Sequence, residues 1–134
     1  MVAAVYRIGA VALALTACTA ALVDERTFDR TRWHVTAIDG APTPVAGDYH
    51  VEFSRRSISG RFGCNGFGGS FSVLGDIMNA GNVTSTMMAC SEPAAGFESH
   101  GFAILRLPMQ MRWTGGTRLT LSNSAGTIEL ERLP

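Results

Sequence analysis

The chain contains the stretch Arg61-Phe62-Gly63-Cys64-Asn65-Gly66-Phe67-Gly68-Gly69-Ser70-Phe71, around which we expect the fold to be organised. Glycine tolerates positive φ and close backbone approach, so glycines among aromatic residues favour a sharp bend between strands, with the rings in a core. The alternative, a phosphate-binding loop, must be followed by a helix. Polar and apolar residues alternate over Ser70–Leu74 instead. The stretch therefore predicts a strand–turn–strand unit.

Two cysteines lie outside the N-terminal segment. Cys64 belongs to the glycine-rich stretch, and Cys90 ends the segment Thr84-Ser85-Thr86-Met87-Met88-Ala89-Cys90. In an exported protein such a pair favours a disulfide, and closing a loop of about 25 residues stabilises a fold by roughly 3–4 kcal/mol. Two buried free thiols are the main alternative. A metal site needs further ligands, and a catalytic thiol needs a positioned histidine base, so we expect neither metal ligands nor catalytic residues here.

Residues 1–18 resemble a lipoprotein export signal. Arg7 precedes an apolar run, Ile8–Leu15, that is too short to span a bilayer comfortably. The following Leu15-Thr16-Ala17-Cys18 resembles a bacterial lipobox, whose cysteine receives diacylglycerol and becomes the first residue of the mature chain. An ordinary signal peptide, cut nearby, would leave Cys18 as an odd thiol. We expect a membrane anchor on Cys18 in the cell envelope. Because Thr19 is not an aspartate, the periplasmic face of the outer membrane is the default location.

Length and charge limit the domain organisation and the partners that we expect for the rest of the chain. We predict a tether over residues 19–30 and one domain over residues 31–134. The whole chain has 11 basic and 11 acidic residues, without a basic patch, so nucleic acid is not expected as a partner. The isolated histidines (His34, His50 and His100) are expected at the surface, and the scattered acids (Glu52, Glu98 and Glu129) form no pair for acid–base chemistry. We expect no cofactor and no enzyme activity.

Period-two alternation recurs along the domain and predicts short strands. They are expected at Trp33–Ile38, Tyr49–Phe53, Ser57–Phe62, Gly69–Leu74, from Ile77 to about Asn82, from Met109 to Thr114, around Leu119–Leu121 and around Ile128–Arg132. One helix is expected to start at Ser91 as N-cap and to end before Pro108, with Phe97, Gly101, Ile104 and Leu105 on one face. This pattern predicts a mainly β fold, a small antiparallel β-barrel of about eight strands with one helix inserted before the last strands.

The order of these motifs resembles the META domain family, the family of the heat-shock protein HslJ, over about residues 31–133. The resemblance lies in Trp33, in the glycine-rich stretch, in Thr86-Met87-Met88-Ala89-Cys90, in Leu119-Thr120-Leu121 and in Glu129-Leu130-Glu131-Arg132. The family-motif residues are Gly63, Cys64, Asn65, Phe67, Gly69, Thr86, Met88 and Cys90. The resemblance implies a lipocalin-like barrel, an envelope lipoprotein and an association with stress or drug tolerance. It implies no enzyme activity.

Three functions remain open. We prefer a non-enzymatic envelope lipoprotein that supports stress tolerance by binding a protein or a cell-wall component. The alternatives are a carrier of a small apolar ligand inside the barrel, and an inhibitor of an exported hydrolase. A thioether site for Cu(I) at the methionines is a weaker hypothesis, because Met109 and Met111 alternate as core residues do. Asn65 is expected to bond the backbone of its own turn.

Overall fold

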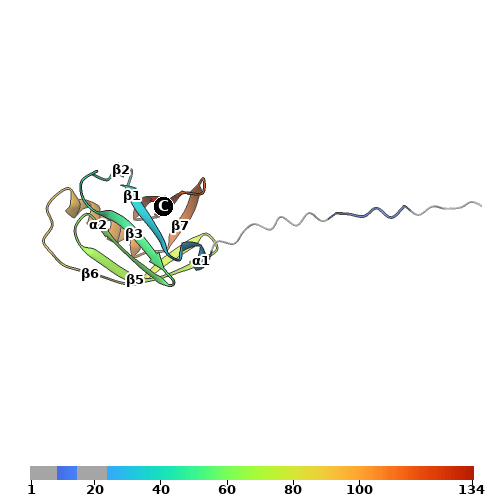
Figure 1. The fold of residues 1–134 in the computed structure, drawn as a ribbon, viewed down its shortest axis with the longest axis horizontal. Coiled ribbons are helices and arrows are strands. Elements are labelled where there is room, and N and C mark those ends of the chain that lie inside the picture. The colour runs from blue at the N-terminus through green and yellow to red at the C-terminus, as the bar shows by residue number, and fades with distance from the viewer. Residues whose placement is uncertain (1–8, 15–23) are drawn as a thin grey trace, which may run out of the picture.

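The computed structural model describes residues 9–14 and 24–134, so the predicted lipidation site, Cys18, lies outside the described residues. The folded part is a closed antiparallel barrel with one short extra strand and a helix at each end (Figure 1). Its sheet has the order β2-β1-β3-β4-β5-β6-β7-β8-β9, and β1 also pairs with β9 to close the barrel. The predicted barrel of about eight strands is therefore confirmed.

Most strands occupy the positions that alternation predicts. The strands are β1 (Thr31–Ile38), β2 (Ala41–Pro42), β3 (Tyr49–Ser54), β4 (Ser57–Phe62), β5 (Gly66–Leu74), β6 (Ile77–Ser85), β7 (Met109–Thr114), β8 (Arg118–Asn123) and β9 (Gly126–Arg132). In β1, Trp33, Val35 and Ala37 are buried, as predicted for one face of a strand. Two of the predicted strands were too short. The glycine-rich residues from Gly66 onward belong to β5, and β6 continues to Ser85 because Thr84 and Ser85 pair with β5.

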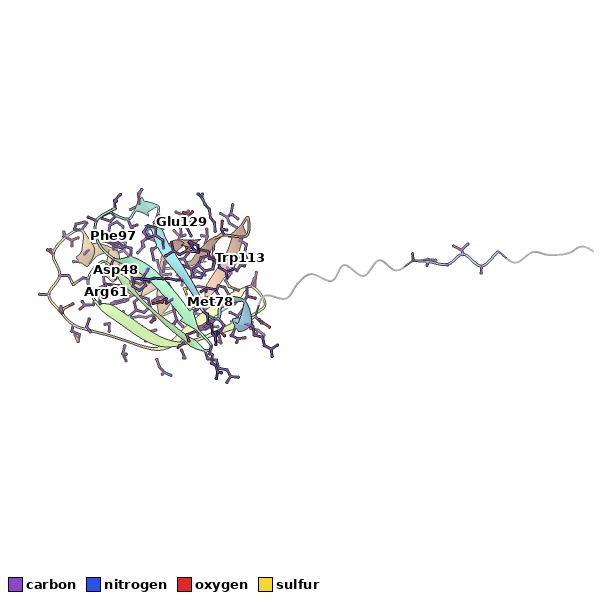
Figure 2. All side chains as sticks on the ribbon, viewed as in Figure 1. Asp48, Arg61, Met78, Phe97, Trp113 and Glu129 are labelled. Carbon is purple, nitrogen blue, oxygen red and sulfur yellow. A yellow bond between two sulfur atoms is a disulfide. The ribbon has the colours of Figure 1, made fainter. Side chains whose placement is uncertain are left out.

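Aromatic side chains fill the two ends of the barrel. At one end Phe28 is fully buried and its ring lies 4.9 Å from that of Phe53 and 5.7 Å from that of Trp113. At the other end the Phe97 ring lies 5.5 Å from the Tyr49 ring. Figure 2 shows Phe97 and Trp113 at these opposite ends. The side chains that point inward thus form one continuous core along the barrel.

Helix α1 (Glu25–Phe28) corrects the predicted tether over residues 19–30. Asp24 caps this helix by accepting a hydrogen bond from the Arg26 N–H at 2.9 Å. The helix places Phe28 in the core, and burying a phenylalanine contributes about 1.5–3 kcal/mol. The segment from Asp24 onward is therefore part of the folded domain, while residues 19–23 lie outside the described residues.

Helix α2 (Ala94–Leu105) covers the other end of the barrel and contacts β1, β4 and β9. The predicted N-cap, Ser91, was wrong. The helix begins after Pro93, which has no side-chain donor or acceptor for a cap, and the Glu92 carboxylate instead accepts from the Gly96 N–H of the first turn at 3.1 Å. The predicted buried face is confirmed at Gly101, Ile104 and Leu105. Gly101 is required there because a Cβ at this position would lie 2.5 Å from the Phe62 ring. Within residues 9–14 and 24–134, no helix has the length and apolarity that crossing a bilayer requires.

Candidate functional site

The predicted disulfide between Cys64 and Cys90 is confirmed. Cys64 lies in the turn between β4 and β5, and Cys90 lies in the segment between β6 and α2. Their Cα atoms are 6.1 Å apart, within the usual range for a disulfide. The bond ties the segment before α2 to the glycine-rich turn, 26 residues away along the chain.

The turn that carries Cys64 depends on Gly63. Gly63 has a φ of 95°, which favours glycine, and a Cβ there would lie 2.5 Å from the Tyr49 hydroxyl. Burial raises the pKa of this Tyr49 phenol. On the outer side, the Arg61 guanidinium donates a hydrogen bond to the Cys64 carbonyl and lies 3.6 Å from the Asp48 carboxylate (Figure 2). Tyr49 on the core side and Arg61 on the solvent side thus both contact the turn and support it.

Asn65 is the polar centre of the site. It is only 4% exposed. Both the oxygen and the nitrogen of its side-chain amide form hydrogen bonds with the segment Thr86–Cys90. The side-chain oxygen accepts from the Met88 N–H at 2.8 Å and from the Thr86 hydroxyl at 2.9 Å. The side-chain nitrogen donates to the Met88 carbonyl at 3.2 Å and lies 3.3 Å from Cys90 Sγ. Asn65 therefore holds a segment more than twenty residues away, and not its own turn as we predicted.

Glu98 of α2 completes this network. One carboxylate oxygen accepts from the backbone N–H of Asn65 at 2.6 Å, and the other accepts from its side-chain nitrogen at 2.9 Å. From the sequence we expected Glu98 to be one of several scattered acids, and this role was not predicted. A signal was present: Glu98 follows Phe97 and precedes Gly101 by three residues, so it lies on the barrel-facing side of the helix. An acid on that face needs a partner, and Asn65 is that partner.

The segment held by Asn65 presents two methionines to solvent. Met87 is 94% exposed and Met88 is 55% exposed, although both belong to a segment with fixed backbone contacts. The Thr86 N–H donates to the Gly66 carbonyl at 3.0 Å, which extends the pairing of β5 and β6. We call residues 86–90 the methionine loop. It is an exposed apolar feature on a supported backbone.

The other candidate residues lie apart from this network. Phe67 is in the core and stacks on Phe62, and Gly69 lies at an irregularity in the pairing of β5 with β6. Met109 and Met111 are buried in the barrel core. His34 and His100 are exposed, and His50 is half-buried on the outer side of β3. Glu52 and Glu129 are exposed on β3 and β9. The structure thus brings together Cys64, Asn65, Thr86, Met88 and Cys90 from the predicted set.

A shallow groove of about 220 Å³ lies beside the methionine loop, between β6 and α2. Its apolar lining comes from Ala80, Val83, Phe102 and Leu105, with Asn82, Ser85 and Arg106 at its polar border. Only Ile77 and Met78 of β6 pair with β7, so the rest of β6 pairs with β5 alone among the described strands. The groove therefore follows the edge of a strand that lacks a second partner.

The comparisons with known proteins agree with this architecture. A model of the META domain family matches residues 26–133, almost the whole described domain. The chain belongs to the META domain family. The match starts two residues after the N-cap of α1, which agrees with the inclusion of that helix in the META domain.

Two solved structures, both determined by NMR, share the fold. One has a TM-score of 0.72 at 21% identity, over 82% of this chain and 95% of its own. The other, from Burkholderia xenovorans, has a TM-score of 0.67 at 22% identity, over 81% of this chain and 86% of its own. A search of the curated proteins found no match. At these identities the structural likeness shows the fold of the META domain alone.

Proposed function

We propose that this META domain protein is a non-enzymatic lipoprotein of the cell envelope that contributes to stress or drug tolerance by binding a partner protein. A lipid on Cys18 would hold it at a membrane, with the folded domain in water. The observation that carries the binding role is the methionine loop, where Met87 is 94% and Met88 55% exposed. Flexible, polarisable methionines are over-used at protein-binding surfaces.

The support beneath the loop favours binding over accidental exposure. Asn65, the Cys64–Cys90 bond and the Thr86 N–H fix the backbone on both sides of Met87. A preorganised loop loses little conformational entropy when a partner binds, so more of the contact energy appears as affinity. The loop is thus a built feature of the domain surface.

The edge of β6 suggests the form of the partner. An extended peptide can add to a strand edge through main-chain hydrogen bonds while its side chains enter adjacent pockets. Here the edge runs along the groove that Phe102 and Leu105 line, and it continues into the methionine loop. Arg106 forms no ion pair with the described residues, so an acidic side chain of the partner would find a counter-ion there. An extended, partly apolar segment of a protein fits this surface.

The carrier of a small apolar ligand is less well supported. Inward-pointing side chains, among them Trp33, Phe53 and Leu121, are almost fully buried and occupy the barrel interior. The groove beside β6, of about 220 Å³, lies between a strand and a helix and not in the barrel interior. Protein binding at the surface therefore explains the exposed features better than storage inside the barrel.

Site-specific photo-cross-linking tests the proposal. A photoreactive amino acid replaces Met87 in one strain and Val45 in a control strain, because Val45 is fully exposed in the loop between β2 and β3. We expect one defined protein adduct from position 87 that position 45 does not give. The adduct should disappear when Met88→Gln and Val83→Arg are added, since these changes remove an apolar contact and obstruct the groove. Equal adducts from both positions would contradict the binding role.

The anchor and the tolerance role have their own tests. Replacing Cys18→Ala should prevent lipid attachment, so that metabolic labelling with a fatty acid marks only the wild-type protein. A Cys18→Ala protein that still carries the label would contradict the anchor. For tolerance, a strain lacking this protein should survive envelope stress less well. The wild type should restore survival, and the Met87→Gln, Met88→Gln variant should not. If both proteins restore survival equally, tolerance does not depend on the methionine loop.

A further inference from the structure

The disulfide has a third potential metal ligand beside it. The sulfurs of Cys64 and Cys90 and a carboxylate oxygen of Glu98 all lie within 4.8 Å of one another, and all three residues are half-buried. Glu98 Oε2 lies 3.7 Å from Cys90 Sγ. Two thiolates and one carboxylate are ligands that Zn²⁺ accepts in tetrahedral sites, with a fourth position open to water.

Asn65 orients the carboxylate toward the sulfurs. Its backbone N–H holds one oxygen of Glu98 at 2.6 Å, and its side-chain nitrogen holds the other at 2.9 Å. That second oxygen is the one that lies 3.7 Å from Cys90 Sγ. Ligands in metal sites are commonly oriented by such hydrogen bonds from neighbouring groups, and these raise metal affinity. The arrangement therefore has both a ligand set and a support for it.

We propose that the reduced form of the Cys64–Cys90 pair, together with Glu98, binds one Zn²⁺ ion, and that formation of the disulfide abolishes this site. In the oxidised chain both sulfurs are engaged in the bond and offer no thiolate. The Cα atoms, 6.1 Å apart, allow the sulfurs to separate to about 3.7 Å, the spacing of two thiolates on tetrahedral zinc.

The conversion requires a reductant, which we assign to the class of dithiols. A thiolate of the dithiol attacks one sulfur of the pair and forms a mixed disulfide, and its second thiol then resolves it. The dithiol is oxidised to its own disulfide, and Cys64 and Cys90 each gain one electron and one proton. Zn²⁺ then displaces the two thiol protons, so binding releases two protons per ion. In an oxidising compartment, the newly exported and still reduced chain would also offer the site.

Zinc titration of the full chain tests this proposal. The protein is reduced with a phosphine, transferred to buffer without oxygen and titrated with Zn²⁺ alone, with native mass spectrometry and a competing chelator as readouts. We expect one Zn²⁺ per reduced chain and none in the oxidised chain. Cd²⁺ in place of Zn²⁺ should give the ultraviolet charge-transfer band of thiolate ligation. A reduced chain that binds no zinc, or an oxidised chain that binds it equally, would overturn the proposal.

Two variants test the ligand set. Glu98→Gln should weaken zinc binding by at least about tenfold, because a neutral amide replaces a charged ligand. Glu129→Gln, an exposed site on β9, should bind like the wild type. Unchanged affinity in Glu98→Gln would remove the carboxylate from the site and overturn the proposal. If reduction loosens the fold, zinc that restores the native circular dichroism supports the site, and zinc bound to a chain that stays unfolded contradicts it.

Discussion

Glu98 accepts two hydrogen bonds from Asn65, one from its backbone N–H at 2.6 Å and one from its side-chain nitrogen at 2.9 Å. This pair joins helix α2 to the turn between β4 and β5, across 33 positions of sequence. The same asparagine side chain holds the methionine loop. The position of the loop is therefore coupled to the docking of α2 through one buried amide.

Replacing Asn65 tests this coupling. Asn65→Ala leaves the Met88 N–H without its acceptor and removes the side-chain donor to Glu98 Oε2, whereas the bond from the backbone N–H of residue 65 to Glu98 Oε1 stays. We expect the free energy of unfolding to fall by about 2–4 kcal/mol. Asn79→Ala, an exposed site on β6, serves as the control and should change it by less than about 0.5 kcal/mol. Denaturant titration measures both. Equal effects would show that the buried amide network contributes nothing to stability.

The disulfide should account for a large share of the stability. We expect the Cys64→Ser, Cys90→Ser variant to lose about 2–5 kcal/mol. Intact mass of the wild type, purified without reductant, should be two hydrogens below the dithiol mass. If reductant leaves the unfolding midpoint of the wild type unchanged, the bond has no stabilising role.

The barrel could be predicted because its signals are local. Burial of Trp33, Val35 and Ala37 on one face of β1 follows directly from alternation in the sequence. The continuation of β6 through Thr84 and Ser85 could not be predicted, since these exposed polar residues lack alternation and join the strand by pairing with Gly68 and Phe67. Strand pairing across the sheet, and not local pattern, sets that boundary.

The site was predictable only in part. The pairing of Cys64 with Cys90 was predicted from the cysteine count and from the expected export of the chain. The link between Asn65 and Glu98 depends on where α2 docks, and that is decided by packing such as Gly101 against Phe62. The position of Phe28 could not be predicted for the same reason, since it also depends on packing. Its charged neighbours indicate a solvated tether, yet its ring completes the aromatic end of the barrel.

The two tryptophans should respond differently to replacement by phenylalanine. The Trp33 indole N–H donates to the Thr31 hydroxyl at 2.9 Å, whereas the buried Trp113 indole N–H has no hydrogen-bond partner among the residues that the structure describes. Trp113→Phe removes an unsatisfied donor, so we expect its cost to be smaller than that of Trp33→Phe by about 1–3 kcal/mol. Thermal unfolding of the two variants provides the comparison. A larger loss for Trp113→Phe would contradict the hydrogen-bond assignment.

Stability should also depend on the ionisation of Glu25. Hydrogen bonds from its own backbone N–H and from the Val73 N–H, the latter at 3.1 Å, lower the pKa of Glu25, and Arg56 adds a smaller charge effect. The folded state therefore binds this proton less readily than the unfolded state. The stabilisation is present above the unfolded pKa of about 4.3 and is lost as the pH falls through the lower folded pKa.

Melting temperatures between pH 7 and pH 3 reveal this contribution. Compared with the wild type, Glu25→Gln should be less stable at pH 7, and the difference should shrink as the pH falls below about 4.3. The melting temperature of the control, Glu129→Gln, should change with pH in the same way as that of the wild type. A constant difference between wild type and Glu25→Gln across the whole range would contradict a lowered pKa.

Asn65 fixes the methionine loop, and hydrogen exchange of the Met88 amide is the measurement that would show it. This N–H donates to Asn65 Oδ1 at 2.8 Å although the Met88 side chain is largely exposed. Residue-resolved exchange should show protection at Met88 in the wild type and its loss in Asn65→Ala, while amides of the β1 core strand stay protected in both. If the Met88 amide of the wild type exchanges as fast as that of an unfolded chain, Asn65 does not fix the loop.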